Sequence, residues 1–244
     1  MIPLFTSDYS IGRSILKIDG PPDGPDTILD IAKENSLKEV YLVEDSMIGF
    51  LESFKIFSSN NIPLRYGVRF KYCNDAKSDN KSDSEYKVII FALNDDGCKS
   101  LYKIYSDAHS MYGGYLDSSI LSPYKSDNLI ILHPFYNSYI YNNMFYFKNC
   151  IHEEVGIKEF YSIEENNLPF DSLIKANLIG KPVIKCKTIL YKNREDADAY
   201  QVYRMACNRS FSKSMSLSSP SLDHFASREF CWESYLEANN GIAV

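Results

Sequence analysis

Residues 41–70, YLVEDSMIGFLESFKIFSSNNIPLRYGVRF, contain two apolar runs with an amphipathic stretch between them. The first run begins at Val40 and ends at Glu44-Asp45, and its unbroken apolar character is typical of a buried strand. The second run, Leu64 to Tyr72, predicts another strand. The stretch between them predicts a helix, because apolar side chains recur at helical spacing: Ile48, Leu51, Phe54 and Phe57. Together these segments form one strand–helix–strand unit.

The same alternation extends in both directions along the chain. Further strands are expected over residues 2–5, 87–93, 129–132, 145–150, 159–163 and 182–190. Further helices are expected near residues 26–37, 97–105, 170–179, 193–207 and 222–236. The polar segment 74–85 interrupts the pattern and is expected to be a mobile insert. Repeated units of this kind predict an α/β protein, and 244 residues fit one barrel domain, which typically has about 250.

Composition excludes several classes of protein. The formal charge is −6 and the basic residues are spread evenly, so strong autonomous binding to nucleic acid is not expected. The sequence has no apolar run of membrane-spanning length, and residues 1–6 lack the features of a signal peptide. Six cysteines are scattered without a CxxC pair, which predicts reduced thiols in a cytoplasmic protein.

Four motifs follow one another along the chain. Ser7-Asp8-Tyr9-Ser10 is an SDYS sequence, and the 41–70 unit comes next. Residues 92–101 read ALNDDGCKSL, and residues 180–199 read GKPVIKCKTILYKNREDADA. In this order, from about residue 4 to 205, they resemble the PHP (polymerase and histidinol phosphatase) domain of the alpha subunit of bacterial DNA polymerase III. The resemblance implies a distorted (β/α)7-type TIM-like barrel over residues 1–208. Residues 209–244 are then a Ser-rich segment and a C-terminal helix that packs on the barrel or extends from it.

In the family these motifs hold two or three metal ions through His, Asp and Glu side chains, and the resemblance places most of those positions on residues that cannot bind metal. The paired histidines of the first motif fall on Leu4 and Thr6, and the acidic residue that follows falls on Arg13. An Asp-His pair falls on Glu44 and Asp45, or one position earlier. The positions of a glutamate, a cysteine and a final Asp-x-His are occupied in this chain by Arg69, Phe135, and Thr188 with Leu190. His133 lies two residues before Phe135.

The residue count agrees with a lost metal site. A metal cluster needs several converging ligands, but the chain has only four histidines, at positions 109, 133, 152 and 224. In a parallel barrel, chemistry takes place at the mouth, the end at which strands finish and loops begin. His133 ends a predicted strand at this mouth, so it is either a lone catalytic base or a packed, hydrogen-bonded side chain. Glu44-Asp45 are either residual ligands or the cap of the next helix. Arg69 is expected to pair with Glu44 or Asp45, so a salt bridge replaces the metal. We therefore expect no catalytic residue, metal or cofactor.

Two aromatic segments are candidates for contact with other molecules. Residues 136–147 are rich in tyrosine and phenylalanine, which indicates base stacking, core packing or a subunit interface. The second segment is the tail from Phe225 to Tyr235, which contains Phe230 and Trp232. These side chains either form a contact surface for another molecule or complete the core.

The resemblance implies a non-catalytic scaffold domain of, or associated with, a bacterial-type replicative DNA polymerase alpha subunit. Its partners would be the polymerase core or other replication proteins, and no membrane is involved. Two other functions stay open. One is an active metal-dependent PHP phosphoesterase or 3′-5′ exonuclease with a reduced ligand set, and the other is a nucleic-acid-binding module.

Overall fold

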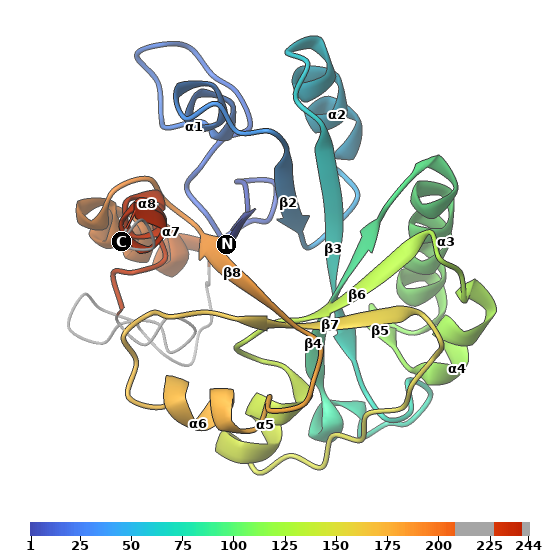
Figure 1. Ribbon diagram of the computed structural model, residues 1–244. Helices are drawn as coiled ribbons and strands as arrows, with labels where there is room; N and C mark the ends of the chain where they lie inside the picture. Colours follow the sequence, from blue (N-terminus) through green and yellow to red (C-terminus); the bar gives the residue numbers. More distant parts are fainter. Residues whose placement is uncertain (208–226, 241–244) are drawn as a thin grey trace.

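The computed structural model describes residues 1–207 and 227–240. Within these residues, seven strands close into a barrel with helices around it (Figure 1). The strands pair in the order β2-β1-β8-β7-β6-β4-β3, and pairing between β2 and β3 closes the ring. The prediction of an α/β barrel is confirmed at this level. The barrel strands are β1 (Ile2–Phe5), β2 (Val40–Glu44), β3 (Leu64–Tyr72), β4 (Tyr86–Ala92), β6 (Leu129–His133), β7 (Lys158–Ile163) and β8 (Val183–Ile189).

The direction of β4 makes the barrel mixed rather than all parallel. β4 pairs antiparallel with both β3 and β6, whereas the other neighbouring pairs in the ring are parallel. The chain passes from β3 to β4 through a short 3-10 helix, η1 (Lys81–Ser84), instead of a crossover helix. Antiparallel neighbouring strands can be joined by a short connection without a crossover helix. The regular alternation of strands and helices is therefore interrupted between β3 and β4. A short strand, β5 (Tyr115–Leu116), pairs with β3 outside the closed ring.

The segment 74–85, expected to be mobile, is tied to the barrel by hydrogen bonds. The backbone N–H of Ala76, a buried residue, donates to Oδ2 of Asp117 at 2.9 Å. Nδ2 of Asn74 donates to the carbonyl of Asn149 at 2.8 Å. Asp117 also caps a short helix by accepting from the N–H of Ile120. These partners lie more than 30 residues away in the chain, so the local polar composition of the segment gave no sign of them.

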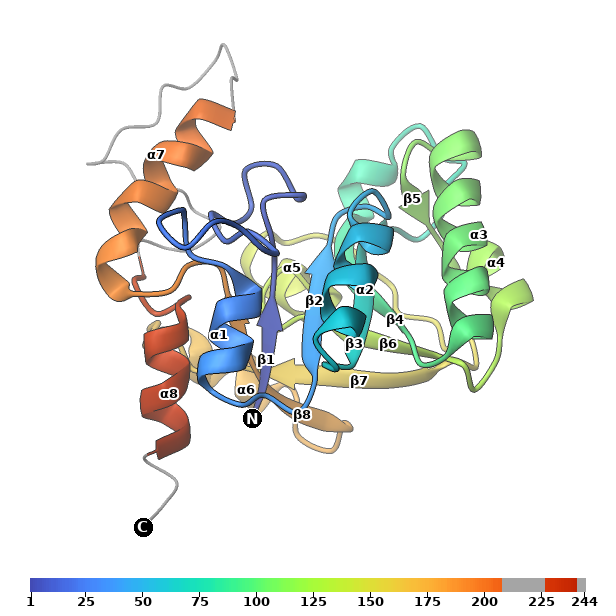
Figure 2. The same cartoon turned by 90° about the horizontal axis from the view of Figure 1, so that it is seen from above.

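The helices lie around the outside of the strands, as two perpendicular views show (Figures 1 and 2). Thr27 and Asn94 cap the first and third helices, since their side chains accept from the N–H groups of Asp30 and Gly97. The helices are α1 (Ile28–Glu34), α2 (Phe50–Ser59), α3 (Asp95–Met111), α4 (Ser118–Leu121), α5 (Tyr139–Phe145), α6 (Asp171–Ala176), α7 (Ala197–Cys207) and α8 (Trp232–Asn240), with the 3-10 turns η2 (Ser122–Tyr124) and η3 (Arg194–Asp196). Among the described residues, no helix has both the length and the apolar character needed to cross a bilayer.

The strand expected over residues 145–150 is wrong. α5 ends at Phe145, and Phe147 has a φ of 50°, which a strand does not allow. Ser138 caps α5. After the helix, the side chain of Asn143 provides hydrogen bonds to the backbone of Cys150: its Nδ2 donates to the carbonyl, and its Oδ1 accepts from the N–H. A side-chain amide therefore takes the place of the expected strand partner.

The tail packs on the barrel rather than presenting an aromatic surface. Trp232 is 3% exposed and stacks on Phe5 of β1, with ring centroids 5.7 Å apart. Phe230 and Tyr235 are also buried, and the Tyr235 hydroxyl donates to the carbonyl of Met1. Of the two alternatives left open for Phe230 and Trp232, a surface and the core, the structure supports the core. The Ser-rich segment 209–221 and residues 222–226 lie outside the described residues.

Arg194, at the start of the segment that leads into α7, ties the same tail down. Its guanidinium bonds the carboxylates of Glu229, at 3.1 and 3.2 Å, and of Glu237, at 2.5 and 2.7 Å. Its backbone N–H donates to Glu233. One arginine thus joins three acids of the tail to the segment that follows β8.

Helix α2 turns most of its predicted apolar side chains outward. Phe57 is fully buried, but Ile48, Leu51 and Phe54 are 79, 66 and 50% exposed. Ser53 lies on the buried face, where its hydroxyl donates to the carbonyl of Gly49. A helix is present as expected. Among the described residues, Ile48 just before it and Leu51 and Phe54 within it stay at least half exposed.

Candidate functional site

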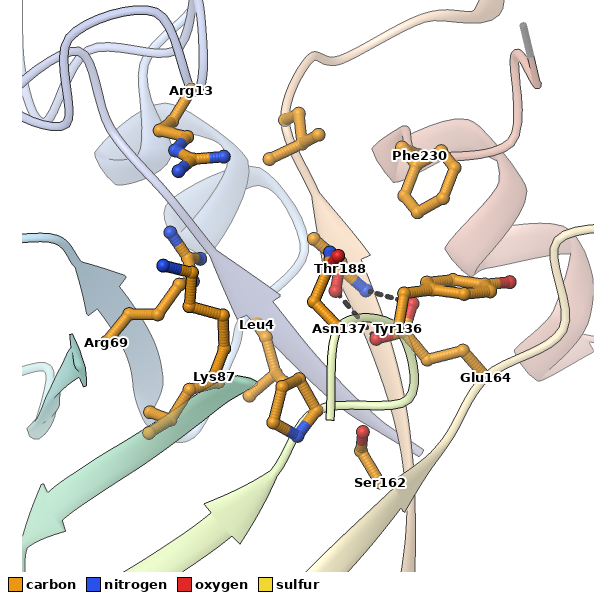
Figure 3. Close-up of a pocket in the computed structure, with 13 residues that line it drawn as sticks. Leu4, Arg13, Arg69, Lys87, Tyr136, Asn137, Ser162, Glu164, Thr188 and Phe230 are labelled. Carbon is orange, nitrogen blue, oxygen red and sulfur yellow. Dashed lines mark hydrogen bonds between the residues drawn. The ribbon is translucent and has the colours of Figure 1, made fainter. Parts of the chain in front are cut away.

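The strand ends at one mouth of the barrel enclose a cavity of about 100 Å³ (Figure 3). Five of the positions that match metal ligands in the resembling family line it: Leu4, Arg13, Arg69, Thr188 and Leu190. Side chains that sequence reasoning did not select complete the wall: Lys87, Ile89, Pro134, Tyr136, Asn137, Ser162, Glu164 and Phe230. The structure therefore gathers half of the proposed positions around one space, although they come from distant parts of the chain.

Asp45 joins two of the arginines at the mouth. Its Oδ1 accepts from Nη1 of Arg69 at 2.6 Å, and its Oδ2 accepts from Nε of Arg13 at 3.0 Å. A second guanidinium nitrogen of Arg69 donates to Thr6 at 3.4 Å, and Thr6 donates to the carbonyl of Val43 at 3.0 Å. Burial acts to raise the pKa of Asp45, but the two guanidinium groups outweigh it and hold this pKa below its ordinary value. The expected pairing of Arg69 with an acid is confirmed for Asp45.

Glu44 points away from the cavity and is enclosed by the SDYS motif. Its Oε1 accepts from the N–H of Ser7 at 2.9 Å and from the Ser7 hydroxyl at 2.6 Å, and its Oε2 accepts from the hydroxyl of Ser10. Glu44 is 1% exposed. Burial raises the pKa of Glu44 to about 7, although the serine hydrogen bonds act in the opposite direction. This acid therefore ties β2 to the loop after β1 and faces no open space that would hold a metal.

A second buried acid, Glu164, lies on the opposite wall. It follows β7, and its carboxylate accepts from the hydroxyl of Thr188 at 2.7 Å and from the Thr188 N–H at 3.2 Å (Figure 3). Nδ2 of Asn166 donates to the same carboxylate at 3.2 Å. The position after a predicted strand at 159–163 is a sequence signal that would have found Glu164. Nothing local identifies Thr188 as its partner.

Lys87 adds a third cation, and sequence reasoning missed it for a topological reason. In a parallel barrel the mouth collects the residues at which strands end. Because β4 is antiparallel, it begins at this mouth, and Lys87 is its second residue. Lys87 lies 3.0 Å from Glu85, and burial lowers the pKa of Lys87 despite that partner. Only the direction of β4, which the sequence did not reveal, explains the position of this lysine.

A neighbouring cavity of about 300 Å³ continues the same cationic surface. Four of its lining residues are basic, Arg13, Arg69, Lys71 and Lys87, and one is acidic, Asp45. A space with this charge favours a phosphate-like anion and opposes a divalent cation. Within residues 1–207 and 227–240, the mouth brings together no three His, Cys, Asp or Glu ligand atoms.

Two proposed positions lie elsewhere, and their placement at the mouth is wrong. Leu132 packs inside the barrel against Leu4, so its neighbour His133 points out through the wall, where it stacks on Tyr161 with centroids 4.5 Å apart. Successive side chains of a strand point to opposite faces of the sheet. A shift of one position along β6 therefore decides whether a side chain points into the barrel or out through its wall. Phe135, 1% exposed, packs in an aromatic cluster outside the barrel with Tyr136. His133 is therefore not a catalytic base at the mouth.

Three cations and the buried carboxylate of Glu164 thus line the small cavity at the mouth, and Asp45 joins two of the cations. The mouth therefore offers positive charge and hydrogen-bond donors to an anion. In comparisons with known proteins, no family and no curated protein sequence matches this chain.

Proposed function

We propose that this chain is a PHP-like barrel without catalysis at its mouth, and that it acts as a scaffold in DNA replication. It would be part of, or associated with, a bacterial-type replicative DNA polymerase alpha subunit in the cytoplasm. The observation that carries the proposal is the Arg13–Asp45–Arg69 bridge, whose three residues match ligand positions of the resembling family. Ion pairs hold together the loops that a metal cluster would otherwise join.

The charge at the mouth supports the non-catalytic part of the proposal. Activation of water for attack on a phosphodiester requires a bound cation or a general base in reach of the substrate. Glu44 is enclosed by serine donors, and Asp45 is held by two guanidinium groups. Glu164 is likewise occupied by Thr188 and Asn166. Each of these three carboxylates, among the described residues, is therefore already engaged by ion pairs or hydrogen bonds.

The arrangement of strands and helices is compatible with the same proposal. A closed ring of seven strands with helices outside it is the coarse architecture expected of a PHP barrel. That the ring represents the distorted (β/α)7 arrangement of that fold is part of the proposal. The antiparallel β4 would then be one of its distortions.

The exposed row on α2 supports the scaffold part. Leu51 and Phe54 lie three residues apart in α2, Ile48 lies in the turn just before the helix, and each of the three is at least half exposed. Contiguous apolar side chains on a surface mark sites where proteins associate, and large side chains supply most of the binding energy. We propose that this row meets the polymerase core. Tyr146 and Phe147, 49 and 90% exposed, are the part of the aromatic segment 136–147 that is left for a second contact.

Binding between the purified chain and the polymerase core encoded in the same genome tests this function. We expect a complex in size-exclusion chromatography, and a Leu51→Ser/Phe54→Ser double variant should weaken it about tenfold or more. Tyr102→Ser is the control, because Tyr102 is 59% exposed on a different helix, α3.

Two results would overturn the proposal. The first is the absence of a complex at concentrations well above those used for known polymerase subunits. The second is hydrolysis of single-stranded DNA or a phosphomonoester that EDTA abolishes and Asp45→Asn removes. The latter would favour the alternative function, a phosphoesterase or exonuclease with a reduced ligand set.

A further inference from the structure

Two histidines and a glutamate converge on the outer wall of the barrel. His133 ends β6, Glu159 lies on the neighbouring strand β7, and His152 comes from the loop between α5 and β7. Nε2 of His133 and Nε2 of His152 each lie 3.0 Å from the same atom, Oε2 of Glu159. Among the described residues, this is the group of three potential metal ligands whose atoms all lie within 4.8 Å of one another.

Two of the three distances among these atoms are compatible with a shared metal ion, and all three atoms lie within 4.8 Å of one another. Ligand atoms that each lie about 2.0–2.1 Å from one ion are about 3.0–3.4 Å from one another in octahedral or tetrahedral geometry. The two measured distances from Glu159 already fall in this range. The rings of His133 and His152 are nearly perpendicular, at 87°, with centroids 5.0 Å apart. Both imidazoles therefore direct Nε2 at the same carboxylate oxygen from different sides.

Neighbouring tyrosines hold the two imidazole rings in these orientations. His133 stacks on Tyr161 with centroids 4.5 Å apart, and His152 stacks on Tyr139 with centroids 4.9 Å apart. The two tyrosine hydroxyls are hydrogen bonded at 3.0 Å. Nδ1 of the buried His133 has no hydrogen-bond partner among the described residues, so stacking on Tyr161 and the contact of Nε2 with Glu159 orient this ring. Rings fixed before a ligand arrives lose little entropy on binding it.

The cluster faces an open space. His152 and Glu159 line a cavity of about 390 Å³ together with Tyr161, Lys181 and Gly180. Nζ of Lys181 lies 4.8 Å from the centroid of the Tyr161 ring. A metal ion bound by the three side chains would have an exchangeable position on this side, and the Lys181 ammonium would favour an anion there.

We propose that His133, His152 and Glu159 form a binding site for a zinc ion, with a fourth position open to a water or an anion such as phosphate. Two imidazole nitrogens, one carboxylate oxygen and one open position are a ligand set that zinc adopts in proteins. The site lies outside the barrel, so it is independent of the ion-paired mouth and of the proposed scaffold function. His133, which sequence reasoning placed at the mouth, gains a different role.

Zinc titration of the full chain tests the site. The protein is stripped with EDTA, dialysed, and titrated with zinc in competition with a chromophoric chelator. We expect one equivalent to bind with micromolar or tighter affinity. Cobalt in place of zinc should give visible d–d bands without a thiolate-to-metal charge-transfer band, which separates this site from the six cysteines.

Three variants decide the outcome. Glu159→Gln and His152→Ala should each weaken zinc binding by about 100-fold or more, because each removes one of three protein ligands. His152 has a side chain that is 18% exposed, so His152→Ala keeps the test valid if Glu159→Gln fails to fold. His109→Ala, which removes an exposed histidine on α3, should bind zinc like the wild type. Absence of the zinc equivalent, or equal binding by His152→Ala and the wild type, would overturn the proposal.

Discussion

Arg69 and Asp45 meet across the mouth of the barrel, with Nη1 of the arginine 2.6 Å from Oδ1 of the acid. The arginine lies within β3 and the acid directly follows β2, so this contact joins two adjacent strands at the mouth of the barrel. Arg13 shares the same carboxylate from the loop after β1. Three elements that pack side by side are therefore linked through one side chain.

A double-mutant cycle on Arg69→Ala and Asp45→Ala should give a coupling energy of about 1 kcal/mol, measured by urea unfolding. The side chains are 16 and 36% exposed, so the value lies between those of surface and buried pairs. The Arg65–Glu39 pair is the control, because its side chains are 40 and 35% exposed at the other end of the barrel. A coupling energy no larger than that of the control would show that the bridge does not stabilise the mouth.

Glu44→Gln should change how stability depends on pH. The pKa of Glu44 is raised from 4.5 to about 7 in the folded chain, so protonation of this acid favours the fold. The stabilisation is full below about pH 4.5 and is lost as the pH rises through 7. We therefore expect the wild type to lose about 3 kcal/mol relative to Glu44→Gln between pH 4.5 and 8. Urea unfolding at both pH values measures this difference, and a difference that stays constant with pH would contradict the prediction.

Trp232→Ala should destabilise the chain by about 3–5 kcal/mol, because the indole is fully packed between Phe5 and Tyr235. Phe147→Ala removes an aromatic ring that is 90% exposed and should change the free energy of unfolding by less than about 0.5 kcal/mol. Thermal or urea unfolding of both variants compares them directly. Equal effects would mean that α8 does not form part of the core.

Inorganic phosphate should raise the melting temperature by a few degrees when it is present at several times its dissociation constant. The anion would neutralise the cations that line the mouth, Arg13, Arg69 and Lys87. Lys87→Gln should reduce this shift, whereas Lys99→Gln, an exposed lysine on α3, should leave it unchanged. Sodium chloride at equal ionic strength serves as the salt control. A shift that is the same in both variants would indicate a general salt effect.

The local patterns in the sequence predicted much of the fold. Val40–Glu44 and Leu64–Tyr72 are strands as expected, and the helix between them is present. The direction of β4 was not predictable, because periodicity specifies a strand but not its orientation. The exposure of Leu51 and Phe54 was also missed, since an apolar row looks the same whether it meets the core or a partner.

The site was predictable in part from strand ends and in part from the family resemblance. Asp45 follows a predicted strand and bonds two arginines, and Thr188, selected by the resemblance, lies on the cavity wall. The prediction that His133 lies at the mouth was wrong, because a shift of one residue in the strand turns a side chain to the opposite face. His152 lies in a loop with no periodic pattern, so its approach to Glu159 is purely a consequence of tertiary packing.

The pairing of β1 with β8 has a consequence for synthesis of the protein. Leu4 lies opposite Thr188, so about 180 residues separate these two paired strands of the ring. At roughly 5–20 residues per second, the ribosome holds β1 without this partner for about 10–40 s. During that time one edge of β1 stays unpaired, and Phe5 lacks the indole of Trp232 that later covers it. The sheet of the nascent chain therefore stays open until β8 emerges, and slow translation prolongs the period in which it can aggregate.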